Sequence, residues 1–203
     1  TLFRSGSHVD LFGNDLEDLS SPENDTRYAL IKELVVKFEE ATTFGSLISM
    51  DNQEQDFVDL QNTIENLVAE GDTLQKAAAK KLLPLVIQAK ILAKKYDAAI
   101  ANPPYMGQGY FNASLKYFAS TVFKEWSGDL FTCFIKRMIN FLKKNGNLSL
   151  ITIGTWTFLP TYENMRASLL KEVNFSSIID NGRGVWGSDH GSIMFSAAKG
   201  VLH

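Results

Sequence analysis

One short stretch, Asn102-Pro103-Pro104-Tyr105, contains residue types that can handle an amine. The amide oxygen of Asn102 and the carbonyl oxygen of Pro103 can each accept one proton of an exocyclic amine and turn its lone pair toward an electrophile. Such catalysis works by positioning and electrostatic stabilisation and needs no strong base. The Tyr105 ring can stack on a flat heterocycle pulled from a duplex. Because consecutive prolines have fixed φ, the motif predicts a rigid amine cradle; the alternative is a rigid structural turn.

The position of this motif depends on the element before it. "YDAAIA", at 96–101, is a short apolar run whose length and flanking residues favour a buried strand. In open α/β sheets, ligands bind beyond the carboxyl ends of the strands, and the motif lies at such an end. We therefore expect the strand to present Asn102 and Tyr105 at the edge of a sheet.

The chain downstream alternates between the two kinds of element. We expect helices over 112–123, 130–144 and 161–171, and strands over 147–153, 175–180 and 192–198. This order predicts a mostly parallel sheet with right-handed crossovers. No helix separates the last two strands, so that pair should be antiparallel.

The chain upstream reads as helical. Apolar spacing predicts helices over 27–48, 53–70 and 72–95, and Pro84 should kink or split the third. We expect three parts: 1–26, poorly ordered or a cloning remnant; 27–95, a helical segment; and 96–203, the catalytic half of an α/β domain.

Composition narrows the function classes. The 203 residues carry a formal charge of −3, which gives no general attraction for nucleic acid. The single cysteine, Cys133, excludes an internal disulfide and fits a reducing compartment. No stretch is long and apolar enough to span a bilayer, and no ligand spacing predicts a metal site. Lys136 and Arg137 read as part of a solvated helix face.

Several segments carry a family resemblance. Asn-Pro-Pro-Tyr after an apolar strand resembles the catalytic motif of S-adenosyl-L-methionine-dependent amino methyltransferases. The resemblance narrows to PglX-type adenine-specific DNA methyltransferases of bacterial phage-defence (BREX) systems. It covers roughly residues 40 to 200 and rests on "ATTFGSLI", "AKILAKKYDAAIANPPYMGQGYFNASLKYF", "DLFTCFIKRMINFLKKNGNLSLITIGTWTFLPTYENMRASL" and "IIDNGRGVWG".

The resemblance implies a fold, a reaction and its partners. The fold is the C-terminal half of a Rossmann-like methyltransferase sheet, preceded by a helical segment. The reaction is site-specific methylation of adenine N6 by S-adenosyl-L-methionine, with Asn102, Pro103, Pro104 and Tyr105 in the catalytic motif. The partners are double-stranded DNA with a flipped adenine and other phage-defence proteins, in the bacterial cytoplasm.

The resemblance also assigns two further groups of residues. Asp129, Leu130 and Phe131 match a segment near the cofactor pocket; for Asp129 the alternative is a plain helix N-cap. Trp156 and Phe158 follow the next strand and would line the base pocket with Tyr105; for them the alternative is core packing.

One expected motif is missing. Such enzymes bind the cofactor with Asp/Glu-x-x-x-Gly-x-Gly after the first strand, and no such turn precedes residue 96. "GRGVWG", at 182–187, fits Gly-x-Gly-x-x-Gly but is followed by a strand rather than a helix, which argues against a phosphate site.

We therefore expect a fragment truncated at both ends, inactive alone. Its 96–101 strand should have an open edge through which two copies associate. Two rival functions remain: methylation of a protein glutamine at N5, which uses the same cradle on an amide nitrogen, and a non-catalytic structural role.

Overall fold

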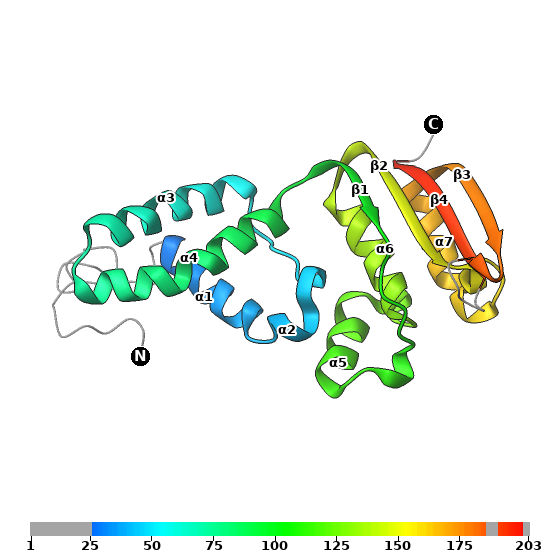
Figure 1. Cartoon of the computed structure of the whole chain (residues 1–203), viewed down its shortest axis with the longest axis horizontal. Coiled ribbons are helices and arrows are strands. Elements are labelled where there is room, and N and C mark those ends of the chain that lie inside the picture. The colour runs from blue at the N-terminus through cyan, green and yellow to red at the C-terminus, as the bar shows by residue number, and fades with distance from the viewer. Residues whose placement is uncertain (1–25, 186–190, 201–203) are drawn as a thin grey trace. The chain divides into compact units, whose positions relative to one another are not determined.

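The computed structural model describes residues 26–185 and 191–200. The chain divides into two compact units, Thr1–Lys94 and Lys95–His203 (Figure 1). The predicted N-terminal segment at 1–26 lies outside the described residues except for Thr26, and so does the end of the glycine-rich loop, at 186–190. Within the described ranges, no helix has the length and apolarity to cross a bilayer.

The first unit is helical, as predicted. It contains α1 (Thr26–Phe38), α2 (Ala41–Phe44), the 3₁₀ turn η2 (Gly45–Leu47), α3 (Glu54–Glu70) and α4 (Thr73–Ala93). The helix expected over 27–48 ends at Phe38, and the chain then forms two short helical pieces. Pro84 does not split the last helix, which continues through it with Leu82 and Val86 buried on either side.

The predicted apolar stripes face one another in this unit. Phe57 and Ile64 of α3 are completely buried, as is Val86 of α4. These side chains belong to one hydrophobic cluster that also takes in Ile31 and Leu34 of α1. Burial of such side chains stabilises the unit by roughly 1.5–3 kcal/mol each.

The second unit contains a four-stranded sheet. Its strands are β1 (Tyr96–Ala101), β2 (Leu142–Ile153), β3 (Val173–Gly182) and β4 (Ser192–Lys199), in the order β1-β2-β4-β3. β1 and β2 are parallel, whereas β4 is antiparallel to both of its neighbours. The antiparallel pairing of the last two strands is therefore confirmed. The prediction of mostly parallel pairing is wrong for the described strands: only the β1–β2 ladder is parallel, because β4 lies between β2 and β3. β1 is an edge strand.

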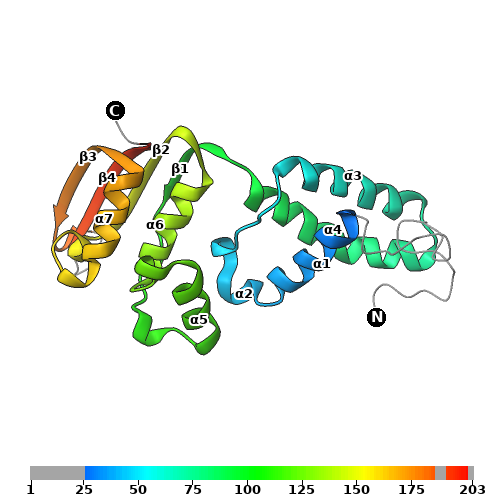
Figure 2. The ribbon, with the colours of Figure 1, turned by 180° about the vertical axis from the view of Figure 1, so that it is seen from behind.

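Two helices, α6 (Leu130–Phe141) and α7 (Glu163–Glu172), cover one face of this sheet. The unit also contains α5 (Ala113–Val122) and the 3₁₀ turns η3 (Gln108–Tyr110), η4 (Lys124–Trp126), η5 (Gly154–Thr157) and η6 (Pro160–Tyr162). Figure 2 shows α6 and α7 in front of the sheet, on the face opposite to the one seen in Figure 1. This arrangement confirms the α/β class with a preceding helical segment.

Side chains alternate between the covered and the open face, as a pleated strand requires. Leu148 and Leu150 of β2 and Phe195 of β4 point under the helices and are almost completely buried. Ile100, Ile179 and Met194 stand on the other face and are exposed. In the part of this unit that the structure describes, no element covers that second face.

The junction of α6 and β2 differs from the prediction. The helix expected over 130–144 ends at Phe141, because Leu142 is already extended and pairs with Tyr96 of β1. The next matched pair is Ala98 with Asn147, so residues 143–146 bulge out of the ladder. A Cβ on Gly146 would lie 3.1 Å from the backbone oxygen of Asp97, so a larger residue here would crowd the neighbouring strand.

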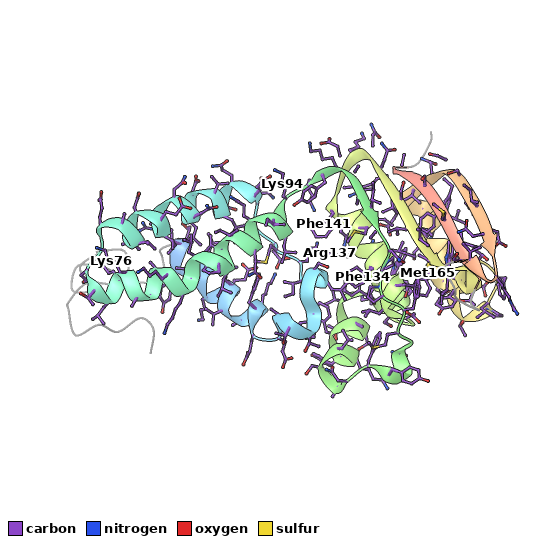
Figure 3. All side chains as sticks on the ribbon, in the orientation of Figure 1. Lys76, Lys94, Phe134, Arg137, Phe141 and Met165 are labelled. Atoms are coloured by element: carbon purple, nitrogen blue, oxygen red, sulfur yellow. The ribbon has the colours of Figure 1, made fainter. Side chains whose placement is uncertain are left out.

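The predicted solvated face of α6 is also wrong for Arg137. Its side chain is 1% exposed, and its guanidinium carbon lies 3.8 Å from the centre of the Phe141 ring, one turn along the helix (Figure 3). Burial lowers the pKa of Arg137 to about 10, so the group stays charged at neutral pH. Lys136 is half-buried and paired with Glu172 at 2.6 Å.

Candidate active site

The Asn102–Tyr105 loop leaves the carboxyl end of β1. The ladder with β2 extends to the pair Ala101 and Leu150, so the backbone is held up to the residue before Asn102. Pro103 is buried, whereas Asn102 and Tyr105 are exposed. The loop is thus anchored at the sheet and presents the two side chains that the sequence singles out.

The Tyr105 hydroxyl is bonded within the motif itself. It donates to Oδ1 of Asn102 at 3.0 Å, and its oxygen also lies 3.3 Å from the backbone oxygen of Ile151, the longer of the two contacts. Desolvation raises the pKa of Tyr105, so the hydroxyl remains a donor at neutral pH. The amide oxygen expected to accept an amine proton therefore accepts the tyrosine proton in this conformation.

A cavity of about 390 Å³ opens beside Asn102 on the uncovered face of the sheet. Asn102 shares this face with Ile100, two positions before it in the chain. The walls combine apolar side chains with strand hydroxyls, and Ser149 and Ser196 are hydrogen-bonded to each other at 2.8 Å. The lining residues are Ile100, Ala101, Asn102, Ser149, Leu150, Ile151, Ser177, Ile179, Met194, Phe195 and Ser196.

Phe131 supports the Tyr105 ring from the covered side. The two ring centres are 6.2 Å apart and the rings meet edge to face at 75°. Phe131 also contacts Tyr162 of η6, at 6.0 Å between ring centres, and has no exposed surface. It is placed to fix the orientation of the tyrosine ring.

Asp129 joins the loop to the start of α6. Its Oδ1 accepts hydrogen bonds from the backbone N–H of Phe131, at 3.2 Å, and of Met106, at 3.0 Å. The N-cap predicted for this residue is confirmed, and Thr132 completes a capping box with it. Desolvation raises the pKa of Asp129, although the backbone N–H groups oppose that shift.

Trp156 and Phe158, which follow β2, lie in different environments. Trp156 is 4% exposed, donates its indole N–H to the Thr152 hydroxyl at 2.9 Å, and packs edge to face on Phe195. Phe158 is 68% exposed. The structure therefore presents Tyr105 and Phe158 at the surface and encloses Trp156 in the core.

Comparison with known proteins places these residues in a family. The model of the Eco57I restriction-modification methylase family matches residues 19–186. The chain belongs to this family. It is 35% identical over 196 residues to "Adenine-specific methyltransferase BrxX" of Escherichia coli O9:H4 (strain HS), a match that covers 95% of this chain and 16% of that protein.

A second relative agrees with the first. "Adenine-specific methyltransferase PglX" of Lacticaseibacillus casei (strain Zhang) is 26% identical over 144 residues, which covers 67% of this chain and 12% of that protein. The expected relationship to PglX-type adenine-specific methyltransferases is confirmed. The chain spans less than a fifth of the length of either relative.

Solved structures give fainter likenesses. A Listeria monocytogenes protein assigned to the class I S-adenosylmethionine-dependent methyltransferases has a TM-score of 0.44 at 11% identity, covering 93% of this chain and 72% of that one. The M protein of the type I restriction enzyme EcoKI has a TM-score of 0.39 at 12% identity, covering 73% of this chain and 37% of that one.

Sequence reasoning missed the contacts that hold the loop of this methylase-family chain. The backbone of residues 106–108 is hydrogen-bonded to that of residues 128–130. Backbone pairing of this kind depends on no particular residue type, so the sequence does not predict it. One signal was present: Asp129 and Thr132 have capping-box spacing, which marks a fixed helix start directly before Phe131. Among the described residues, no three histidine, cysteine or acidic side chains converge as metal ligands would.

Proposed function

We propose that this chain forms the amine-binding part of an S-adenosyl-L-methionine-dependent methyltransferase that methylates adenine N6 in double-stranded DNA. The observation that carries this proposal is the placement of Asn102: it is exposed at the end of β1, and its amide oxygen already accepts a hydrogen bond, from Tyr105 at 3.0 Å. Similarity to two adenine-specific methyltransferases supports it.

Each residue of the motif has a separate task. Asn102 Oδ1 and the Pro103 carbonyl oxygen accept the two N6 protons of a flipped adenine, which turns the nitrogen lone pair toward the methyl donor. Pro104 stiffens the loop between them and Tyr105. The Tyr105 ring stacks on the base, and its hydroxyl leaves Asn102 as the base arrives. Phe158, which is exposed, is a further contact for the base, whereas the buried Trp156 belongs to the core beneath the site.

The cofactor, when bound, supplies the methyl group. The described residues fit one side of its site: Asn102 and the Asp129–Phe131 segment lie around the loop that must face it. Asp129 is not suited to hold the ribose, because it is buried and its Oδ1 accepts hydrogen bonds from two backbone N–H groups. We propose that the glycine-rich turn belongs to another part of the parent protein, and that this chain alone is inactive.

The parent would work on DNA in the bacterial cytoplasm, with other phage-defence proteins as partners. Because this chain has a charge of −3, the basic surface that docks DNA is local or lies elsewhere in the parent. In isolation, the free edge of β1 is the surface through which two copies of the chain would pair.

Glutamine-N5 methylation is the rival reaction, since the same two acceptors can hold an amide nitrogen. The test offers the full-length parent radiolabelled S-adenosyl-L-methionine with double-stranded DNA or with a glutamine-containing protein. We expect label in DNA, recovered as N6-methyladenine after digestion to nucleosides. Label found only in protein would refute the DNA assignment, and label in neither would favour a non-catalytic role.

A further inference from the structure

Asp129 touches both the motif's loop and the helix beneath it. We propose that Asp129 is a positioning residue, which fixes the Asn102–Tyr105 loop in the conformation that accepts an amine. This inference rests on the proposed function for its consequence in catalysis, whereas its structural part concerns the chain alone.

Three hydrogen bonds hold the chain directly after the motif, one to the Asp129 carboxylate and two between backbone groups. Met106 donates its N–H to Asp129 Oδ1 at 3.0 Å, and its carbonyl oxygen accepts from Leu130 at 2.9 Å. Gln108 donates to the carbonyl oxygen of Gly128 at 3.1 Å, and Gly107 and Asp129 form an antiparallel bridge. Since Met106 follows Tyr105 directly, these hydrogen bonds fix the chain at the first residue after the motif.

Asp129 is itself held by the first turn of α6. Asp129 is 7% exposed, and its backbone N–H lies 3.3 Å from the Thr132 hydroxyl, which closes the first turn of α6. The next residues of that turn bring Phe131 under the Tyr105 ring. The ends of the motif are thus fixed by two different supports: the β1–β2 ladder before Asn102, and Asp129 after Tyr105.

Holding the loop is separable from capping the helix. Both N–H groups, of Met106 and of Phe131, point at the same oxygen of Asp129. An asparagine keeps that acceptor at the same distance from the backbone. A serine caps a helix well but is one bond shorter, so it satisfies the helix and not Met106. Catalysis by positioning is sensitive to such a change, because a displacement of about 1 Å can cost on the order of 100-fold in rate.

The first test measures amide exchange in the 203-residue chain. In Asp129→Ser, the Met106 amide should exchange about 13- to 160-fold faster, the loss expected for one hydrogen bond to a charged acceptor. Asp129→Asn keeps an acceptor in place, so its Met106 amide should exchange more slowly than that of Asp129→Ser. Asn112→Ala is the matched control: it removes the N-cap of α5, whose Oδ1 accepts from Leu115 at 2.8 Å, and should leave Met106 unchanged. Unchanged Met106 exchange in Asp129→Ser would overturn the proposal.

The second test measures methyl transfer by the full-length parent. Asp129→Ser should lower kcat at least 10-fold with little change in the KM for DNA, Asp129→Asn should restore it, and Asn112→Ala should not affect it. Equal losses in the serine and asparagine variants would overturn the role of the acceptor. If Asn102→Ala retains full activity, the proposed function fails, while the exchange measurement still decides whether Asp129 holds the loop.

Discussion

Replacing Tyr105 separates the work of its ring from that of its hydroxyl. The ring is 46% exposed and rests on Phe131, while the hydroxyl is bonded to Asn102 at 3.0 Å. Tyr105→Ala removes the stacking surface, which is worth about 1–3 kcal/mol per base, or about 5- to 160-fold in transfer rate. Tyr105→Phe keeps that surface and removes a hydrogen bond worth about 0.5–1.5 kcal/mol net.

The small effect expected for Tyr105→Phe follows from the hydrogen bond between the Tyr105 hydroxyl and Asn102. A base must displace the Tyr105 hydroxyl from the Asn102 oxygen, so losing the hydroxyl also removes a competitor for that acceptor. We therefore expect Tyr105→Phe to methylate DNA within about threefold of the wild-type rate, a shift smaller than one such hydrogen bond can give.

The assay is single-turnover transfer of labelled methyl groups to double-stranded DNA by the full-length parent, with enzyme in excess. A thermal melt of each variant checks that folding is kept. If the phenylalanine and alanine variants lose activity equally, the hydroxyl rather than the ring does the work, and the stacking account is refuted.

Three further predictions concern the 203-residue chain itself. Calorimetry should detect no S-adenosyl-L-methionine binding, because residues 26–95 contain no strand followed by a glycine-rich turn; micromolar affinity would contradict this. Light scattering should show association as concentration rises, since β1 is an edge strand; a strict monomer with slow amide exchange along Tyr96–Ala101 would show that the edge is covered. Desolvation raises the pKa of Asp129, so the folded state holds that proton more tightly than the unfolded state, and stability falls as pH rises through the carboxyl range to the raised pKa. Asp129→Asn removes this carboxyl, whose charge is buried once it ionises, and should therefore raise Tm more at neutral than at acidic pH. The neighbours Tyr162 and Cys133, whose pKa values are also raised, stay neutral at both pH values and add nothing to the difference. Equal shifts in Tm at both pH values would refute this.

The sequence was most informative where local chemistry decides structure. The limits of β1 and the start of α6 at Leu130 were predicted as observed, because an apolar run before two prolines and an aspartate before an apolar helix are local signals. The end of α6 was placed three residues too late. Leu142 leaves the helix to pair with Tyr96, a partner 46 positions earlier, which no local pattern reveals.

The same limit applies to the candidate site. The loop's place at the end of a strand was predictable from its residues, whereas the environment of Trp156 was not, because only the folded sheet shows that its ring packs on Phe195. Arg137 was misplaced for a related reason: a charged residue on a helix reads as solvated unless a neighbour such as Phe141 covers it. The hydroxyl of Tyr105 on Asn102 likewise depends on loop geometry.

Asn102→Ala in the full-length parent tests the central claim most directly. Asn102 is exposed, and its side chain accepts a hydrogen bond from Tyr105, so the free energy of unfolding of the variant should stay within about 1 kcal/mol of wild type, the net value of one hydrogen bond. The measurement is N6-methyladenine formed in double-stranded DNA from S-adenosyl-L-methionine. We predict that the variant forms none while wild type methylates; methylation by Asn102→Ala at the wild-type rate would contradict the account.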